Sequence, residues 1–143
     1  MSDRRPVIPQ DMKAFNRAIV QEWRANAGRL SGPMAGRNLI LLTTTGASSG
    51  QPRTIVVGFG RNGDNLVAIA SNNGAPAHPA WYLNLLADPV ATVELGADKF
   101  DIRARPARPD EREELAKAVP YLESQQQLTE REIPLVILER IES

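Results

Sequence analysis

Strand-like runs separated only by short turns constrain the fold of this chain more than any other feature. Three such runs, rich in apolar and β-branched residues, cover 38–45, 54–59 and 65–71. The last two flank residues 61–64, Arg-Asn-Gly-Asp, and Asn-Gly is a strong hairpin signal. Connections this short favour antiparallel pairing, because parallel neighbours need long crossovers.

The second half of the chain adds further strands and helices. Strands are predicted over 90–95, 99–105 and 134–139, and helices over 9–27, over 79–87 and from Pro109 onward. Residues 99–105 alternate, with Phe100, Ile102 and Ala104 on one face, which is typical of a strand with one wet side. About six mostly antiparallel strands with flanking helices predict an α+β fold built on a small barrel. We expect a flexible arm over 1–8 and one domain over 9–143.

Two details of this prediction concern burial. Trp81, Leu83, Leu85 and Leu86 of the predicted helix over 79–87 are available for burial. The stretch 120–132 is polar and glutamine-rich, and no element is predicted there.

Composition excludes several classes of function. The chain has 17 basic and 17 acidic residues, so no strongly basic face for nucleic acid is expected. It has no cysteine, and His78 is its one histidine, which excludes disulfides, thiolate catalysis and a histidine-rich metal site within one chain. No apolar run reaches the roughly 18 residues of a membrane span, and no secretory signal is evident. These observations predict a cytoplasmic protein without a membrane span.

The stretch 43–53, TTTGASSGQPR, is the most informative segment. Gly46 and Gly50 permit left-handed backbone, and consecutive amides there can form an anion-binding nest. Ser48 and Ser49 offer hydroxyls, and Arg53 can clamp an anion through its planar fork. On composition alone, an ordinary polar turn is a slightly better explanation, because loops of glycine and serine are common.

A second loop, 71–84, reads SNNGAPAHPAWYLN and leads into a helix N-terminus that attracts anions. Trp81 can stack on a flat ring or anchor the core. For His78, capping or solvent exposure is a better interpretation than proton transfer. The two loops together predict a phosphorylated, planar cofactor lying across the mouth of the barrel. The usual GxGxxG and P-loop fingerprints are missing.

Three runs of residues resemble the deazaflavin-dependent nitroreductase family, whose members bind coenzyme F420. They are NLILLTTTGASSGQPRT, VAIASNNGAPAHPAWYLNLLADPVATVEL and TEREIPLVILER, and the resemblance extends over about residues 38–140. It implies a split β-barrel fold. It also implies that reduced F420 donates hydride to a small organic substrate such as a nitro compound, a quinone or an activated alkene.

The resemblance also implies roles for individual residues. Those matching the family's cofactor-binding segments are Ala47, Ser48 and Ser49 in the first loop, Arg53, the strand residues Thr54, Ile55, Val56, Val57 and Gly58, the segment Ala70, Ser71 and Asn72, and the helix residues Ala80, Trp81, Tyr82 and Asn84. The proton donor is left open between Tyr82, Tyr121, Ser71 and bulk water.

The chain departs from the family in positions that concern binding of the acidic cofactor tail and in positions that concern the substrate. Ala47, Ser48, Ser49 and Ala77 stand where many members carry basic residues, and 121–127 holds one tyrosine where the prototype has several. A pocket of Leu122, Ser124 and glutamines is expected to favour conjugated carbonyl compounds, such as unsaturated lactones or quinones, over nitroimidazoles. The alternatives are a flavin mononucleotide (FMN) oxidoreductase and a non-catalytic carrier of F420 or lipid. A homodimer is one option for the oligomeric state.

Overall fold

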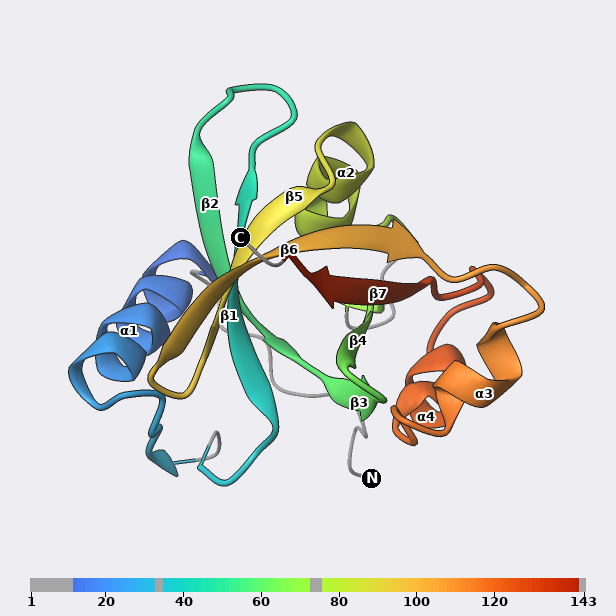
Figure 1. Cartoon of the computed structure of the whole chain (residues 1–143), viewed down its shortest axis with the longest axis horizontal. Coiled ribbons are helices and arrows are strands. Elements are labelled where there is room, and N and C mark those ends of the chain that lie inside the picture. Colours follow the sequence, from blue (N-terminus) through green and yellow to red (C-terminus); the bar gives the residue numbers. More distant parts are fainter. Residues whose placement is uncertain (1–11, 33–34, 73–75, 142–143) are drawn as a thin grey trace.

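A sheet curled into a half-barrel forms the centre of the computed structural model, which describes residues 12–32, 35–72 and 76–141 (Figure 1). The elements follow in the order α1 (Met12–Ala25), β1 (Leu39–Thr45), β2 (Pro52–Gly58), β3 (Gly60–Asn62), β4 (Asn65–Ile69), α2 (Ala80–Ala87), β5 (Val90–Leu95), β6 (Asp98–Pro106), α3 (Arg112–Ala116), α4 (Leu122–Gln126) and β7 (Leu135–Arg140). The arm predicted over 1–8 and the helix start predicted at Pro9 lie outside the described residues.

The strands are arranged in the order β2-β1-β5-β6-β7-β4-β3, and every neighbouring pair is antiparallel. β2, at one edge of the sheet, contacts β4, the strand next to the other edge, so the sheet is curled. The predicted antiparallel barrel is therefore confirmed. No helix within the described ranges is long and apolar enough to cross a membrane.

Two elements of the fold were absent from the prediction. The turn was predicted over 61–64, but it consists of Gly63 and Asp64 alone, which lie between Asn62 and Asn65. The residues before it are therefore free to form the short strand β3. The glutamine-rich helix α4 buries only Leu122, so it has no apolar periodicity to reveal it. The described residues thus form seven strands and four helices rather than six and three.

The pairing of β2 also differs from the prediction. Residues 54–59 and 65–71 are predicted to form one hairpin, but β2 pairs with β1 along its whole length, from Pro52 opposite Thr45 to Gly58 opposite Leu39. The Asn-Gly turn joins β4 to β3 instead. The Asn-Gly turn was predicted at the right place. The strand predicted to pair across it was wrong, because β3 and not β2 pairs with β4.

The interior of the half-barrel is filled by alternate residues of the strands and by one face of α2. Trp81, Tyr82 and Leu85 of α2 belong to this core, which also includes Ile40, Leu42, Phe59, Leu66, Ala68, Ala70, Ala91, Val93, Ile102, Ala104, Val136 and Leu138. Leu83 and Leu86, by contrast, are 47% and 54% exposed. Their predicted burial is wrong, because α2 packs only one face against the barrel.

The outer faces of the sheet are covered by the other helices (Figure 1). Trp23 of α1 packs with Leu39 and Leu41 on the outer side of β1. Residues of α3 and α4 pack on β4 and β7 through a separate cluster that includes Val67, Ile69, Leu115, Val119, Leu122, Ile133, Leu135 and Ile137. The charged helix predicted from Pro109 is shorter than expected, since residues 109–111 form a turn before α3.

Candidate functional site

The loop between β1 and β2 is held in a fixed shape by its own backbone. The Gly46 amide donates to the Gln51 carbonyl oxygen over 2.8 Å, and the Gly50 amide donates to the Gly46 carbonyl oxygen over 2.8 Å. Gly50 has a φ of 70°, which glycine adopts without the steric cost of a side chain. The loop is therefore a formed turn that displays its exposed side chains.

Predicted anion-binding side chains meet on this loop. Ser49 Oγ accepts hydrogen bonds from the Gln51 amide over 3.1 Å and from Arg53 Nη2 over 3.4 Å. Ala47, Ser48, Ser49 and Arg53 are all exposed. A guanidinium beside a hydroxyl can bind phosphate or carboxylate oxygens. The structure thus groups Ser49 and Arg53 as a candidate for binding an anion.

Asn84, which is 8% exposed, ties this loop to α2. Its Oδ1 accepts a hydrogen bond from the Ala47 amide over 2.9 Å, and its Nδ2 donates to Thr44 Oγ1 over 3.1 Å. The Ala47 amide is therefore already used within the protein. Asn84 fixes the position of the loop on the helix, a positioning role that a lone amide in the apolar helix sequence AWYLNLLA already suggests.

Arg131, for which the sequence analysis predicts no role, holds the chain where β4 ends. Its Nη1 donates to the Ala70 carbonyl oxygen over 3.2 Å, and its Nη2 donates to the Ser71 carbonyl oxygen over 2.9 Å. Its Nη1 also lies 2.7 Å from His78 Nδ1. Because arginine has donors only, Nδ1 must accept this bond, which places the imidazole proton on Nε2.

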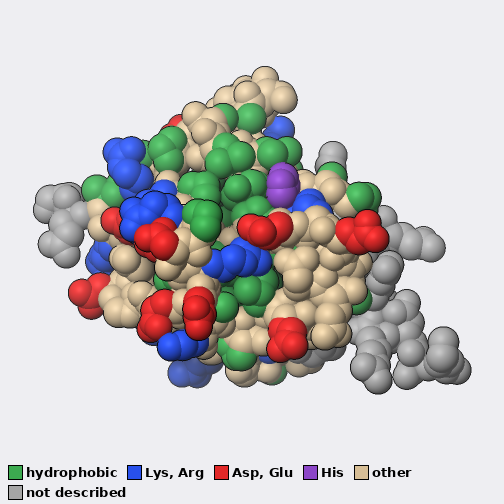
Figure 2. Space-filling view, turned by 90° about the vertical axis from the view of Figure 1, so that its right-hand side faces the viewer, with side chains coloured by type: hydrophobic (Ala, Val, Ile, Leu, Met, Phe, Trp, Pro, Cys, Tyr) green, Lys and Arg blue, Asp and Glu red, His purple; other side chains and the backbone are tan. Residues whose placement is uncertain are grey.

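His78 does not cap α2, so the capping interpretation is wrong. The residue preceding the helix is Pro79, and no side chain caps the helix there. The His78 ring instead lies 5.0 Å from the Tyr82 ring, centroid to centroid. Figure 2 shows the histidine beside a basic side chain, at the border of a hydrophobic area of the surface. The Arg131 contact therefore couples the second loop to the segment before β7.

The candidate proton donors lie in different surroundings. Tyr82 is 9% exposed, and burial raises its pKa. Tyr121 is 38% exposed, and its pKa is raised by burial, an effect that the nearby Arg37 opposes. The Tyr121 hydroxyl lies 3.4 Å from the position that a Cβ on Gly58 would occupy. The structure therefore places Tyr121, the more accessible of the two tyrosines, at the end of β2.

The remaining predicted residues divide between core and surface. Those in the barrel core or packed against it are Ile55, Val57, Ala70 and Trp81. Thr54 and Val56 lie on the opposite face of β2, where Val56 packs beside Trp23 and Thr54 Oγ1 lies 2.8 Å from Thr43 Oγ1. Asn72 and Ala80 are exposed. Trp81, 6% exposed, acts as a core anchor.

Three side chains of the segment 121–127 make contacts within the protein. Leu122 is buried between α4 and the sheet, and Ser124 Oγ donates to the Tyr121 carbonyl oxygen over 2.9 Å. The Gln126 amide group donates to the Arg131 carbonyl oxygen over 2.7 Å and accepts from the Ile133 amide over 2.9 Å. Leu122, Ser124 and Gln126 thus hold the segment itself together, and the substrate pocket expected there stays a prediction.

Comparison with known proteins gives consistent matches. Residues 15–140 match the model of the F420H(2)-dependent quinone reductase family. The chain is 34% identical over 127 residues to an F420H(2)-dependent quinone reductase of Mycobacterium tuberculosis, a match covering 82% of this chain and 85% of that one.

Solved structures agree with this match. An F420-H2 dependent reductase superposes with a TM-score of 0.63 at 35% identity, over 72% of this chain and 95% of that chain. A structure described as a domain-swapped dimer gives a TM-score of 0.66 at 32% identity, over 84% of this chain and 94% of that chain. The predicted split-barrel fold, the resemblance to F420-dependent reductases and the oxidoreductase class are thereby confirmed. The chain belongs to the F420H2-dependent quinone reductase family.

Proposed function

We propose that this protein uses reduced F420 to reduce a quinone to the hydroquinone. The quinone takes up a hydride, which carries two electrons, and then a proton, while the cofactor is oxidised. The family and the names of the relatives support this cofactor and acceptor. The observation that carries the proposal is the contact between the exposed Ser49 and Arg53 side chains beside a formed loop, which Asn84 links to α2 through the Ala47 amide.

The residues present fit such a cofactor. Arg53 and Ser49 would bind the acidic phosphate and glutamate groups of its tail, since a guanidinium and a hydroxyl both donate to anionic oxygens. Tyr121 lies beside Gly58, with its hydroxyl 3.4 Å from the position that a Cβ on this glycine would occupy, and so stands next to the strand that the resemblance assigns to the deazaflavin ring. When bound, the reduced deazaflavin supplies the hydride.

Tyr121 is our proposed proton donor. It is accessible and adjoins Gly58, whereas Tyr82 is buried in the barrel core. Burial raises the pKa of Tyr121, so its hydroxyl keeps its proton throughout the neutral range and can deliver it to the reduced acceptor. Ser71 is half-buried, and Arg131 holds its carbonyl oxygen.

The test is a titration of the cofactor-free protein with F420 and with FMN, followed by steady-state oxidation of reduced F420. F420 is expected to bind far better than FMN. Arg53→Ala is expected to raise the F420 dissociation constant about tenfold or more, because a charge-assisted contact is lost. Arg103→Ala, on the exposed face of β6, is the matched control and is expected to change nothing. FMN binding equally well would favour the FMN alternative.

The acceptor panel compares a naphthoquinone, an unsaturated lactone and a nitroimidazole by kcat/KM, which reports differential transition-state binding. We expect the naphthoquinone to be the best acceptor and the nitroimidazole the poorest. A preference for the nitroimidazole would contradict the proposed acceptor class without affecting the cofactor. Cofactor binding with no turnover of any acceptor would favour a carrier.

We also propose that two copies of the chain associate. The support is a related structure described as a domain-swapped dimer. Light scattering after gel filtration is expected to give twice the mass of one chain, and a mass of one chain would refute the dimer.

A further inference from the structure

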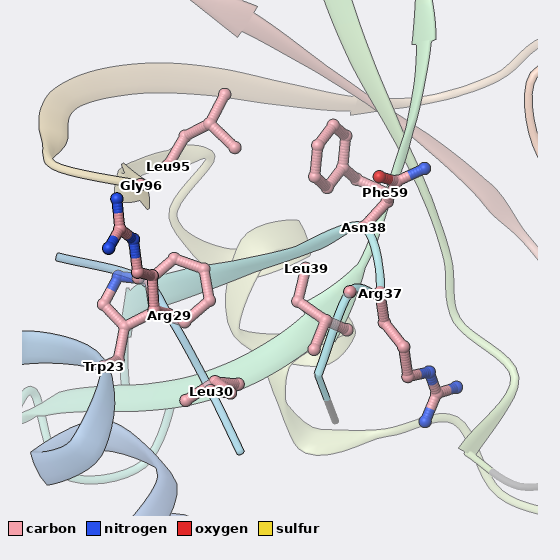
Figure 3. A pocket seen from close by; sticks show the side chains of 11 residues that line it. Trp23, Arg29, Leu30, Arg37, Asn38, Leu39, Phe59, Leu95 and Gly96 are labelled. Carbon is pink, nitrogen blue, oxygen red and sulfur yellow. The ribbon is translucent and has the colours of Figure 1, made fainter. Parts of the chain in front are cut away.

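A cavity of about 410 Å³ lies at the end of the half-barrel where β1 begins, whereas the β1–β2 loop lies where β1 ends. Its apolar wall is formed by Leu30, Leu39, Phe59 and Leu95, together with the indole of Trp23. Figure 3 shows Trp23, Arg29 and Leu30 on one side of it and Asn38, Leu39 and Phe59 on the other. Cavities of this size and composition are typical of small-molecule sites.

The indole ring of Trp23 forms part of the wall of this cavity. The Trp23 side chain is 4% exposed, and its Nε1 has no hydrogen-bond partner in the part of the chain that the structure describes. Indole nitrogen can only donate, and a buried donor without a partner is unfavourable. The protein encloses this nitrogen, so Trp23 offers the cavity the apolar surface of its ring.

The charged side chains of the lining are hydrogen-bond donors. Arg29 and Arg37 line the cavity, and no aspartate or glutamate is among its described lining residues. The site therefore favours a ligand that offers acceptor oxygens on a flat apolar body. A quinone has this chemistry, since its oxygens accept hydrogen bonds and its ring is apolar.

We propose that this cavity is the quinone pocket, an inference that rests on the proposed function. The ring of Trp23 packs against the quinone, and Arg29 stabilises the negative charge that a quinone oxygen carries once hydride has added to the ring and before the proton arrives. A cation placed where charge develops stabilises the transition state more than the neutral substrate. The quinone thus gains two electrons and a hydrogen as hydride, and the proton completes the hydroquinone.

The position of the cavity suits this role. The cavity-lining residue Phe59 directly follows Gly58, where the predicted ring-side strand ends. Arg37 also lines the cavity and lies close enough to Tyr121 to oppose the rise of its pKa. The proposed proton donor is therefore close to one side of the pocket.

Intrinsic fluorescence can locate the ligand, because Trp23 and Trp81 are the two tryptophans of the chain. Cofactor-free protein is titrated with menadione, a naphthoquinone that quenches indole fluorescence on contact. We expect saturable quenching in the wild type and in Trp81→Phe, and its loss in Trp23→Phe, with circular dichroism confirming that each variant is folded. Saturable quenching that persists in Trp23→Phe, or its absence in the wild type, would overturn the proposal.

Calorimetry of two variants, one of them new, tests the chemistry of the pocket. Calorimetric titration of Arg29→Gln and Trp23→Phe with menadione is expected to give dissociation constants raised about three- to tenfold. Arg103→Gln is expected to match the wild type. Arg29→Gln is also expected to lower kcat, because the charge it stabilises exists only after hydride addition. Naphthoate binding more tightly than menadione would overturn the assignment in favour of an aromatic anion.

These experiments separate the pocket from the reaction. Menadione turnover with unchanged KM and kcat in Arg29→Gln and Trp23→Phe would refute the pocket and leave the proposed function standing. Saturable, Trp23-dependent menadione binding without turnover of any acceptor would refute the function and support the pocket.

Discussion

Replacing Asn84 by leucine tests whether the link between the first loop and α2 holds the site together. The change keeps the side-chain size and removes both hydrogen bonds of the amide, one from the Ala47 amide over 2.9 Å and one to Thr44 Oγ1 over 3.1 Å. Asn84 and Thr44 are 8% and 2% exposed, so water cannot readily replace the lost partner of Thr44.

The cost follows from these two contacts. A buried hydroxyl left without a partner costs about 1–3 kcal/mol, and an exposed amide that exchanges its partner for water costs about 0.5–1 kcal/mol. Asn84→Leu is therefore expected to lower the free energy of unfolding by about 1.5–4 kcal/mol. Removing the orphaned hydroxyl as well, in Asn84→Leu with Thr44→Val, is expected to restore about 1–2 kcal/mol of this loss.

Urea unfolding followed by tryptophan fluorescence measures these free energies. The single variants Asn84→Leu and Thr44→Val form a thermodynamic cycle with the double variant. F420 titration of the folded variants is expected to show weaker binding, since the loop that carries Ser49 and Arg53 loses its attachment. A loss below about 0.5 kcal/mol for Asn84→Leu, or strictly additive effects of the two substitutions, would refute the reasoning.

Three further results are expected. Gly60→Ala places a Cβ 1.9 Å from the Ala118 carbonyl oxygen and is expected to lower the free energy of unfolding by about 1–3 kcal/mol in urea; an unchanged midpoint would contradict this close packing. Hydrogen bonds from Arg105 lower the pKa of Glu111 to about 2, so its contribution to stability is present above pH 4.5 and is lost as the pH falls toward 2. The wild type should therefore lose more thermal stability than Glu111→Gln between pH 5 and 2, and equal losses would argue against the ion pair. Tyr121→Phe is expected to lower kcat about tenfold or more, with an unchanged F420 dissociation constant; an unchanged kcat would assign the proton to water.

Local patterns in the sequence predicted the strands better than their arrangement. The alternation of 99–105 predicted that Ile102 and Ala104 face the same side, and both are buried in the barrel core. The partner of β2 could not be predicted, because the choice between β1 and β4 depends on contacts across the whole sheet. Leu83 and Leu86 looked buried for a similar reason, since helical spacing alone does not show how much of a helix the barrel covers.

The candidate site likewise combines contacts that local sequence patterns predict with contacts that they do not. Ser49 and Arg53 are close in sequence, and their contact could be expected from the loop that carries them. The contacts of Arg131 with Ala70 and Ser71 join residues about sixty positions apart, so no local pattern announces them. In the same way, only the folded chain shows that the Trp23 indole nitrogen has no hydrogen-bond partner among the described residues.

The order of strands in the sheet has a consequence for how the chain folds. β2 and β3 are separated by Phe59 alone, yet they form the two opposite edges of the sheet. The sheet is completed only when Leu41 pairs with Glu94 and Leu66 pairs with Leu138, which closes long loops. Such pairings carry an entropic cost before they contribute stability, so folding is expected to take milliseconds to seconds. Substitutions in the local β5–β6 hairpin should then slow folding less than substitutions between β4 and β7, which can be measured by stopped-flow refolding.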